Sequence, residues 1–290
     1  MKRSAAEVGF DWVNKLLLSL LGCLTLYPFL YVFGLSISPP QEVHLIGLQL
    51  FPFHPTFRIY EKVLSLPHLL DSYVFTALRT VLGVAITVLV TTLTAYPLAR
   101  RTFPHRSFFM KLMVFSMLFN GGVIPSYLLV KQLGLMDSVW ALVLPCAISG
   151  FQVIVVRNFF EAIPGEIAES ARIDGAGEYG IYVRIVLPLS APILAVVCLW
   201  AAVHHWNAWF DAMIYISDVK KQVLSLFLRR NILDESATTA SDMTMLDPLL
   251  VTPKNLEAAM IMAVSMPILL AYPFVQNYFA QGILLGSVKG

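Results

Sequence analysis

Long apolar runs dominate the chain and recur at lengths that match the thickness of a lipid bilayer. A helix needs about 20 mostly apolar residues to cross roughly 30 Å of hydrocarbon. Six such windows can be placed: Trp12 to Ser36, Ser72 to Ala99, Ser107 to Val130, Ser138 to Val156, Ile185 to Ile216, and Leu256 to Gly282. The pattern predicts an all-α integral membrane protein with six transmembrane helices.

The composition agrees with this interpretation. Of the 290 residues, 58% are hydrophobic and 13% are charged, and the mean hydropathy is +0.73. A large soluble core is the alternative for long apolar helices, but six of them leave too little polar surface to cover them. The first window continues past Tyr27 and Pro28 without a small-residue cleavage site, so we expect a retained helix and not a signal peptide.

Short loops indicate the orientation in the membrane. Four basic residues crowd the connection after the second window: Arg100, Arg101, Arg106 and Lys111. The next connection, from Lys131 to Asp137, has a single lysine. The excess of positive charge places the former in the cytoplasm, and both termini then lie in the cytoplasm as well.

Two longer segments are expected outside the bilayer. Residues 38–71 contain five prolines that break helices. Residues 217–255 are polar around Asp234 to Asp247 and are expected to form a solvated external loop. We expect residues 1–290 to form one membrane unit with no separate soluble domain.

Several kinds of chemistry are excluded or disfavoured. Cys23, Cys146 and Cys198 lie in apolar windows and are too dispersed for a disulfide framework or a metal site. The net charge of +2 gives no indication of nucleic-acid binding. The sequence has no GxxxxGK[ST] phosphate-binding loop. We therefore expect no cofactor or metal on this chain, and energy supplied by another subunit.

The loop between the fourth and fifth windows, residues 157–188, alternates charged and apolar positions. Pro164 and Glu166 suit the first turn of a helix, and Gly175 and Gly177 end or bend it. We expect a short amphipathic helix, a glycine break and a second short helix that leads through Leu187 and Pro188 into the next window. Such a helix enters a groove on a partner or lies on the membrane surface.

Spacing within this loop favours the partner. The order is Glu169, Ser170 and Ala171, then Gly175, then Ile185, Leu187 and Pro188. It resembles the Glu-Ala-Ala loop of ATP-binding-cassette (ABC) importer permeases, with Ser170 as a small-for-small departure. The resemblance implies a type I permease fold in which this loop is the coupling helix that docks on a cytoplasmic ATPase. Asp174 and Ala176 complete an Asp-Gly-Ala run common in the family's sugar importers.

The resemblance is closest to the carbohydrate branch, particularly the second permease of maltose-type importers. It rests on Asn120 to Pro125, Leu133 to Asp137 and Trp140 to Pro145. It implies a core permease domain at residues 72–283 and a C-terminal tail, with Gly286, Lys289 and Gly290, that reaches toward the ATPases. The implied partners are a second permease, two ATPases that hold ATP and Mg, an extracytoplasmic solute-binding protein and the lipid of a bacterial cytoplasmic membrane.

Residues Trp206 to Asp211 are similar to a subgroup that serves oligosaccharides, including importers of alginate. Polar side chains here are costly in lipid and normally face a cavity, and aromatic rings beside them can stack on sugars. The predicted pathway residues are His205, Trp206, Asn207, Trp209 and Asp211. The alternative is an interfacial aromatic belt with Asp211 just outside the hydrocarbon.

Other interpretations of the polar groups stay open. His204 and His205 diverge by about 100° on a helix, which disfavours a shared metal. Arg79 and Lys111 are interpreted as snorkelling or inter-helix partners. An intramembrane enzyme would use His204, His205 and Asp211, yet no HExxH pattern is present. An ion-driven secondary transporter would have paired broken helices in two related halves and no partner-binding loop.

Overall fold

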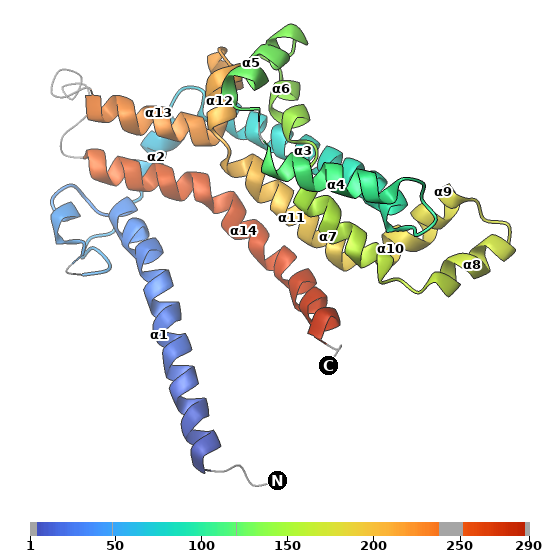
Figure 1. Ribbon diagram of the computed structural model, residues 1–290. Helices are drawn as coiled ribbons and strands as arrows, with labels where there is room; N and C mark the ends of the chain where they lie inside the picture. The colour runs from blue at the N-terminus through green and yellow to red at the C-terminus, as the bar shows by residue number, and fades with distance from the viewer. Residues whose placement is uncertain (1–4, 48, 120, 238–251, 288–290) are drawn as a thin grey trace. The chain divides into compact units, whose positions relative to one another are not determined.

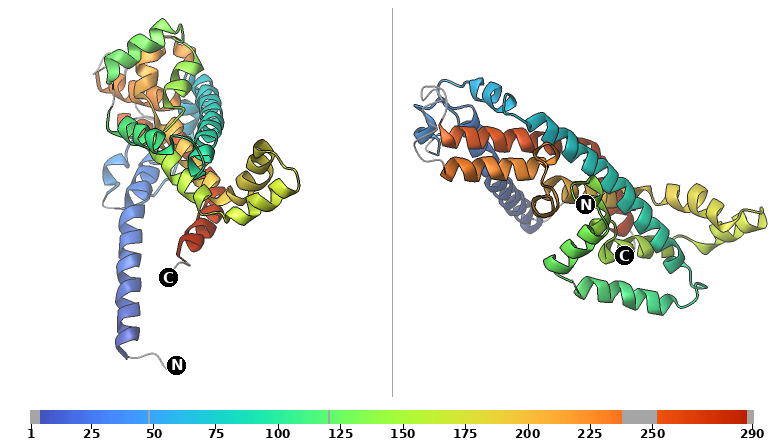
Figure 2. Two further views of the ribbon diagram at one scale, coloured as in Figure 1. Left: turned by 45° about the vertical axis from the view of Figure 1, so that its right-hand side comes forward. Right: turned by 90° about the horizontal axis from the view of Figure 1, so that it is seen from above.

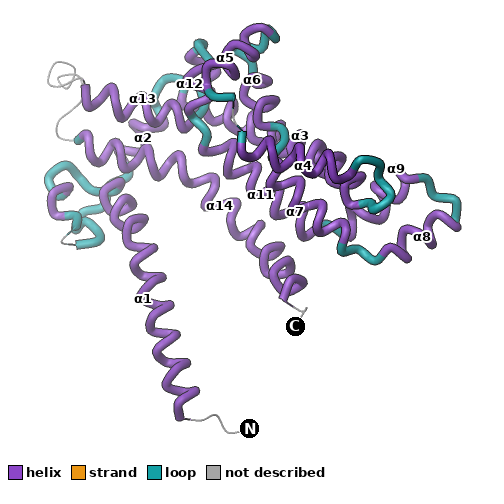
Figure 3. The backbone as a smooth tube through the Cα atoms, in the orientation of Figure 1, coloured by secondary structure: helices purple, strands orange, loops and turns teal. Residues whose placement is uncertain are grey.

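The structure is a computed structural model that describes residues 5–47, 49–119, 121–237 and 252–287. Helices form the regular secondary structure throughout these ranges, beside one isolated bridge between Ile46 and Gln49 (Figure 3). The prediction of an all-α chain is confirmed. The chain divides into two compact units, residues 1–67 with 228–267 and residues 68–227 with 268–290.

The first unit contains α1 (Ala5–Ser36), the 3-10 turn η1 (Val43–Leu45) and α2 (Arg58–Leu64). Parts of α13 (Leu224–Ala237) and α14 (Pro253–Ser287) also belong to it. Its core joins Leu35, Val43, Ile46 and Ala258. Asn255 donates a hydrogen bond to the carbonyl of Ser38 at 3.2 Å, which ties the start of α14 to the end of α1.

The second unit is built around α3 (Leu69–Ala99). The other helices follow in order: α4 (Arg106–Leu118), α5 (Val123–Gln132), α6 (Val139–Val143), α7 (Gly150–Glu161), α8 (Gly165–Ile173), α9 (Glu178–Ile181), α10 (Leu187–Leu189), α11 (Ala191–Asn207) and α12 (Phe210–Tyr215). Figure 1 shows α3, α7 and α11 side by side. Small and branched residues meet between them, among them Ala95, Val153, Val156 and Val197, so the helices approach closely.

Two helices are long and apolar enough to cross a membrane by themselves, within Gly9–Ser36 and Leu69–Ala99. Three pairs of shorter helices pass the same test together but are bent, which raises the number of candidate spans in the described residues to as many as five. Val139–Cys146 meets Gly150–Glu161 at 55°, and Glu178–Leu189 meets Ala191–Asn207 at 80°. The third pair is Arg106–Leu118 with Val123–Gln132.

The windows at residues 107–130, 138–156 and 185–216 each form two helices that meet at a bend. The bend before α7 is flanked by Pro145 and Gly150, and the bend before α11 is flanked by Pro188 and Pro192. A proline removes one backbone donor and clashes with the preceding turn, which explains these positions. The sixth predicted window falls on α14, whose side chains beyond residue 270 lie outside the described residues.

The two segments expected outside the bilayer contain more structure than predicted. Between the prolines of residues 38–71, α2 buries Ile59 and Val63 completely, because all five prolines lie outside its seven residues. In the second segment, residues 223–227 bury Val223, Leu224 and Leu226. Apolar side chains anchor these stretches, so they are not plain solvated loops; residues 238–251 lie outside the described ranges.

The loop at residues 157–188 forms a helical hairpin of α8 and α9, which projects from the ends of α7 and α10 (Figure 2). Helix α8 begins after Pro164 and ends at Ile173, and Gly175, two residues beyond, has φ +83°. Gly175 donates to the carbonyl of Arg172 and Ala176 donates to that of Ala171, at 3.0 and 2.9 Å. This is a Schellman motif, which needs a left-handed residue at the glycine position. The predicted helix, glycine break and second helix are confirmed.

From the hairpin the chain continues through the π-helix η3 (Tyr182–Val186) and α10 into α11. Five residues of π-helix are rare and occur mainly as local insertions in α-helices. The wider turn lies just before Pro188, whose ring cannot be accommodated in a regular helix interior.

Gly175→Ala is expected to loosen the end of α8, because a left-handed alanine costs about 1–2 kcal/mol. The amide of Ala176 should then exchange its hydrogen roughly fivefold faster or more, measured by mass spectrometry on the protein in lipid. Gly177→Ala is the matched control: Gly177 has φ −71° and open space around a new Cβ. Equal exchange rates in the two variants would contradict the motif's role.

Candidate functional site

The predicted coupling residues divide into an outward and an inward set on the hairpin. Glu169, Ser170, Asp174 and Gly175 are exposed, as is Pro188 at its root. The inward set consists of Ala171, Ala176, Ile185 and Leu187, which pack against the core formed by α3, α7 and α11. The structure therefore brings the motif together in one hairpin, with one side exposed and the other packed against the core.

Two large apolar side chains of the hairpin are exposed. Ile173, the last residue of α8, is 87% exposed, and Tyr179 in α9 is 76% exposed. Contact with lipid is a poor explanation for the exposure of Ile173, since the neighbouring residues Arg172 and Asp174 are charged. Exposed apolar groups rimmed by polar residues mark interaction surfaces.

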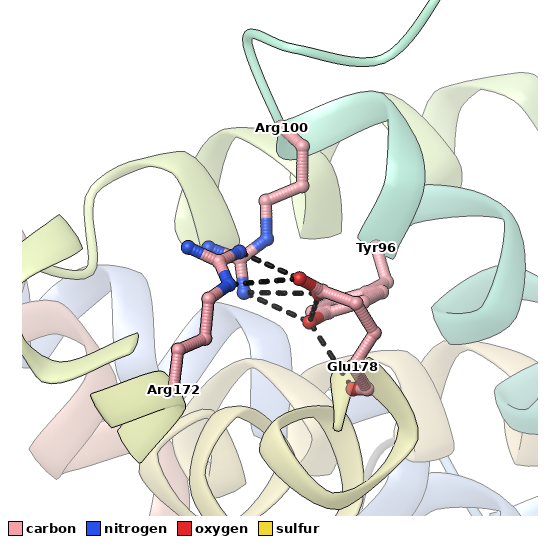
Figure 4. A network of polar contacts seen from close by, with 4 residues as sticks. All are labelled: Tyr96, Arg100, Arg172 and Glu178. Carbon is pink, nitrogen blue, oxygen red and sulfur yellow. Dashed lines mark hydrogen bonds and ion pairs between the residues drawn. The ribbon is translucent and has the colours of Figure 1, made fainter. Parts of the chain in front are cut away.

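A polar network fastens the hairpin to the end of α3 (Figure 4). The Tyr96 hydroxyl donates to Glu178 Oε2 at 2.7 Å, and Arg172 donates to Glu178 Oε1 from Nη2 at 2.6 Å and Nε at 3.0 Å. Arg100 donates to the Tyr96 hydroxyl at 2.8 Å and lies over that ring. Glu178 thus joins α8, α9 and α3 through one carboxylate.

The network changes the electrostatics of the loop. The hydrogen bond from Tyr96, followed by that from Arg172, lowers the pKa of Glu178 below its ordinary value of 4.5. The same contact with Glu178 raises the pKa of Arg172. The pair therefore stays charged across the physiological range. Sequence reasoning missed Tyr96 and Arg100 as partners, because they lie 82 and 78 positions from Glu178.

A second ionic cluster joins α4 and α7. Glu161 accepts from Arg106 at 2.9 Å and forms an ion pair with Arg157. Arg157 also donates to the carbonyl of Leu98 near the end of α3 at 3.4 Å. Three helix ends are thereby held beside the base of the hairpin.

An ion pair of a buried arginine lies in the first half of α3. Arg79 is fully buried, donates to the Ala208 carbonyl at 3.1 Å and pairs with Asp211 of α12. Such a charge in a membrane protein requires a partner within the protein. The interpretation of Arg79 as an inter-helix partner is confirmed, and Asp211 is engaged in this pair.

The other predicted pathway residues do not share one surface. His205 is 1% exposed, and its ring occupies the space where a side chain on Gly83 would lie. The Trp206 carbonyl accepts from Ser225 at 2.9 Å, while the Asn207 side chain donates to the Val203 carbonyl at 2.9 Å. Trp209 packs on the cluster around Leu142 and Tyr215. Whether these residues touch a substrate stays a prediction.

The remaining site predictions are placed as follows. Gly286 lies within α14, and Lys289 and Gly290 lie outside the described residues. Among the residues that the structure describes, no group of three or more His, Cys, Asp or Glu side chains could hold a metal ion.

Comparison with known proteins gives consistent relatives. No family model matches the chain. It is 42% identical over 291 residues to Protein LplC of Bacillus subtilis (strain 168), covering 100% of this chain and 98% of the relative. It is 38% identical over 281 residues to the polygalacturonan/rhamnogalacturonan transport system permease protein YtcP of the same organism, covering 97% and 98%.

A solved structure agrees with these relatives. The crystal structure of a bacterial ABC transporter involved in the import of the acidic polysaccharide alginate contains a chain with a TM-score of 0.86 and 31% identity. The match covers 96% of this chain and 99% of that one.

Glu178→Gln is expected to loosen α9 by less than about 1 kcal/mol, since the carboxylate is more than half exposed. Above pH 4.5 the amide of Ile181, which bonds within α9 to Gly177, should exchange up to about fivefold faster than in the wild type. A lowered pKa gives stability that is lost as the pH falls through it, so the difference should vanish in acid. Glu166→Gln is the control; an effect equal to that of Glu178→Gln would contradict the network.

Asp211→Asn alone is expected to destabilise the second unit by about 3–5 kcal/mol, because it leaves the buried charge of Arg79 unpaired. Arg79→Met alone is expected to destabilise it less, because the carboxylate that it leaves unpaired is 21% exposed. The double variant should lose at least about 1 kcal/mol less than the sum of the single variants. Unfolding in mixed detergent micelles measures all three. The exposed Arg101→Met is the control, and additive losses would contradict the coupling of the pair.

Proposed function

The chain belongs to the permease subunits of ABC sugar importers, and from this premise we propose that it carries an oligosaccharide across the bacterial cytoplasmic membrane. Two of the relatives serve polygalacturonan or rhamnogalacturonan and alginate, by their descriptions. Both descriptions name acidic sugar polymers, which makes acidic oligosaccharides the proposed substrate class. The relatives are transport subunits, so ATP hydrolysis belongs to partners that hold ATP and Mg.

We infer a complex of this chain with a second permease, two ATPase subunits and an extracytoplasmic solute-binding protein. In it the chain would have six spans with both termini in the cytoplasm. By length and composition the two long helices and the three bent pairs support up to five of these spans, with α9 outside the membrane, and α14 would supply the sixth. The residues Gly286, Lys289 and Gly290 would reach toward the ATPases.

The observation that carries the proposal is the exposed Ile173 at the tip of a hairpin whose base is firmly held. Docked interfaces gain most of their affinity from a few large side chains buried at their centre. Ile173 and Tyr179 are suited to fill a cleft on the ATPase, with Glu169 and Asp174 at the rim. Closure of the ATPases would move α8, and the Glu178 network and α10 would pass this movement to α3 and α11.

Such a subunit catalyses no reaction and acts by changing its conformation. The binding protein delivers the saccharide, the ATPases close on ATP, and the spans change between inward-facing and outward-facing states. Breaks at Pro145 and Pro188 would let one part of a span rotate while the other stays packed.

Reconstituted complexes test the function directly. Acidic oligosaccharides with the binding protein are expected to stimulate ATP hydrolysis and to enter proteoliposomes, with neutral oligosaccharides as the comparison. In the same assay, Ile173→Asp and Glu169→Lys should leave membrane insertion intact and reduce the stimulated ATPase rate tenfold or more, because a central contact is worth at least about 2 kcal/mol.

Val219→Asp, another exposed apolar position but in the predicted external segment, is the control and should retain the stimulation. Stimulation by amino acids or metal ions in place of sugars would overturn the carbohydrate assignment. Unchanged stimulation in Ile173→Asp would contradict docking through the tip of α8.

A further inference from the structure

A cavity of about 440 Å³ lies in the second unit between α3, α7 and α11. It falls within the range of about 300–1,000 Å³ that is usual for small-molecule sites. Its lining includes Thr87, Phe151, Gln152, Trp200, His204 and His205. Of the predicted pathway residues from His205 to Asp211, only His205 lines it.

Two aromatic rings form one side of the cavity. Phe151 of α7 and Trp200 of α11 have ring centroids 5.4 Å apart and planes inclined by 42°. Phe151 is 51% exposed and Trp200 is half-buried, so both present free surface. An aromatic face suits the C–H face of a sugar ring, as it does other flat apolar surfaces.

Polar groups on the same cavity lack partners within the protein. Thr87 Oγ1, Gln152 Oε1 and His205 Nδ1 are buried without a hydrogen bond. Thr87 and His205 are 3% and 1% exposed. An unsatisfied buried polar atom costs about 1–3 kcal/mol, and such atoms are rare in native proteins. The residues that carry these three atoms line one cavity from three helices, and the hydroxyl groups of a sugar would offer them partners.

The charges are compatible with this ligand class. The cavity lining contains no Asp or Glu, and its polar groups are a hydroxyl, an amide and two imidazoles beside Ser149. Such a lining suits the hydroxyl-bearing part of a sugar ring, and it offers no counter-ion to a cation or to a carboxylate.

We propose that this cavity binds one ring of the oligosaccharide during translocation, with Phe151 and Trp200 against the apolar face and Thr87, Gln152 and His205 on hydroxyl groups. The proposal rests on the proposed function and adds a place for the sugar. It moves the expected contact from Trp206–Asp211 to Trp200 and the residues opposite it. A ring held here is retained by the permease after it leaves the binding protein.

The ratio of saccharide transported to ATP hydrolysed tests this site in the reconstituted complex. Trp200→Leu keeps an apolar side chain but removes the stacking surface, and the ratio is expected to fall roughly tenfold. Trp200→Phe should stay within about twofold of the wild type. Trp140→Leu, which changes an exposed tryptophan of α6 outside the cavity, is the control.

Thr87→Val supplies a second variant that does not threaten folding, because the hydroxyl that it removes has no partner in the protein. It should leave the unfolding midpoint unchanged or higher and lower the transport ratio about fivefold. A merely structural role for these residues would lower ATP hydrolysis and transport together and leave the ratio constant.

Ile148→Cys, at an exposed position of the cavity lining, gives a binding readout in a background with serine at Cys23, Cys146 and Cys198. Saccharide-loaded binding protein with ATP should slow maleimide labelling several-fold. Normal ratios in Trp200→Leu and Thr87→Val, with unprotected labelling, would overturn the site while wild-type transport of sugar upholds the function. Absence of sugar transport by the wild type would instead overturn the function itself.

Discussion

The guanidinium of Arg79 has to be satisfied inside the protein, because hydrocarbon offers it no partner. Its ion pair with Asp211 and its bond to the Ala208 carbonyl fix the start of α12 against α3. The turn before them is equally constrained, since the ring of His205 fits over α3 only where Gly83 has no side chain. One buried charge thus determines how α11 and α12 lie on α3, and with it the wall of the cavity.

The same helix also reaches the α8–α9 hairpin. Tyr96 follows Arg79 by 17 residues, or about 25 Å along a helix, and the network of Tyr96 and Arg100 with Glu178 holds the α8–α9 hairpin there. Because α3 is continuous from Leu69 to Ala99 while its neighbours α7 and α11 each begin after a break, it is the rigid reference. The hairpin and the cavity are both built against it.

Local chemistry made part of this structure predictable. The positions of Pro164, Gly175 and Gly177 predicted where α8 begins and ends, because helix ends depend on single residues. The angles at the breaks within three apolar windows were not predictable, since hydropathy reports length and composition and not direction. Contacts such as Arg79 with Asp211, 132 positions apart, depend on tertiary packing. The contact between Phe151 and Trp200 was not predictable either, because it depends on how α7 packs against α11.

Unpartnered polar atoms on α3 have to be separated by what they face. Hydrogen-bond partners are also lacking for Ser72 Oγ, Arg79 Nε, Thr80 Oγ1 and Thr91 Oγ1, but these residues do not line the cavity, whereas Thr87 does. After Thr91 the polar side chains of α3 have partners again. Thr92 forms a hydrogen bond with the Tyr182 hydroxyl at 2.8 Å, and the ring centroids of Tyr182 and Tyr96 are 5.0 Å apart. Tyr182 belongs to the π-helix that connects the hairpin to α11. A row of polar side chains on α3 therefore runs from Thr87 at the cavity to the Glu178 network, so one helix carries both features.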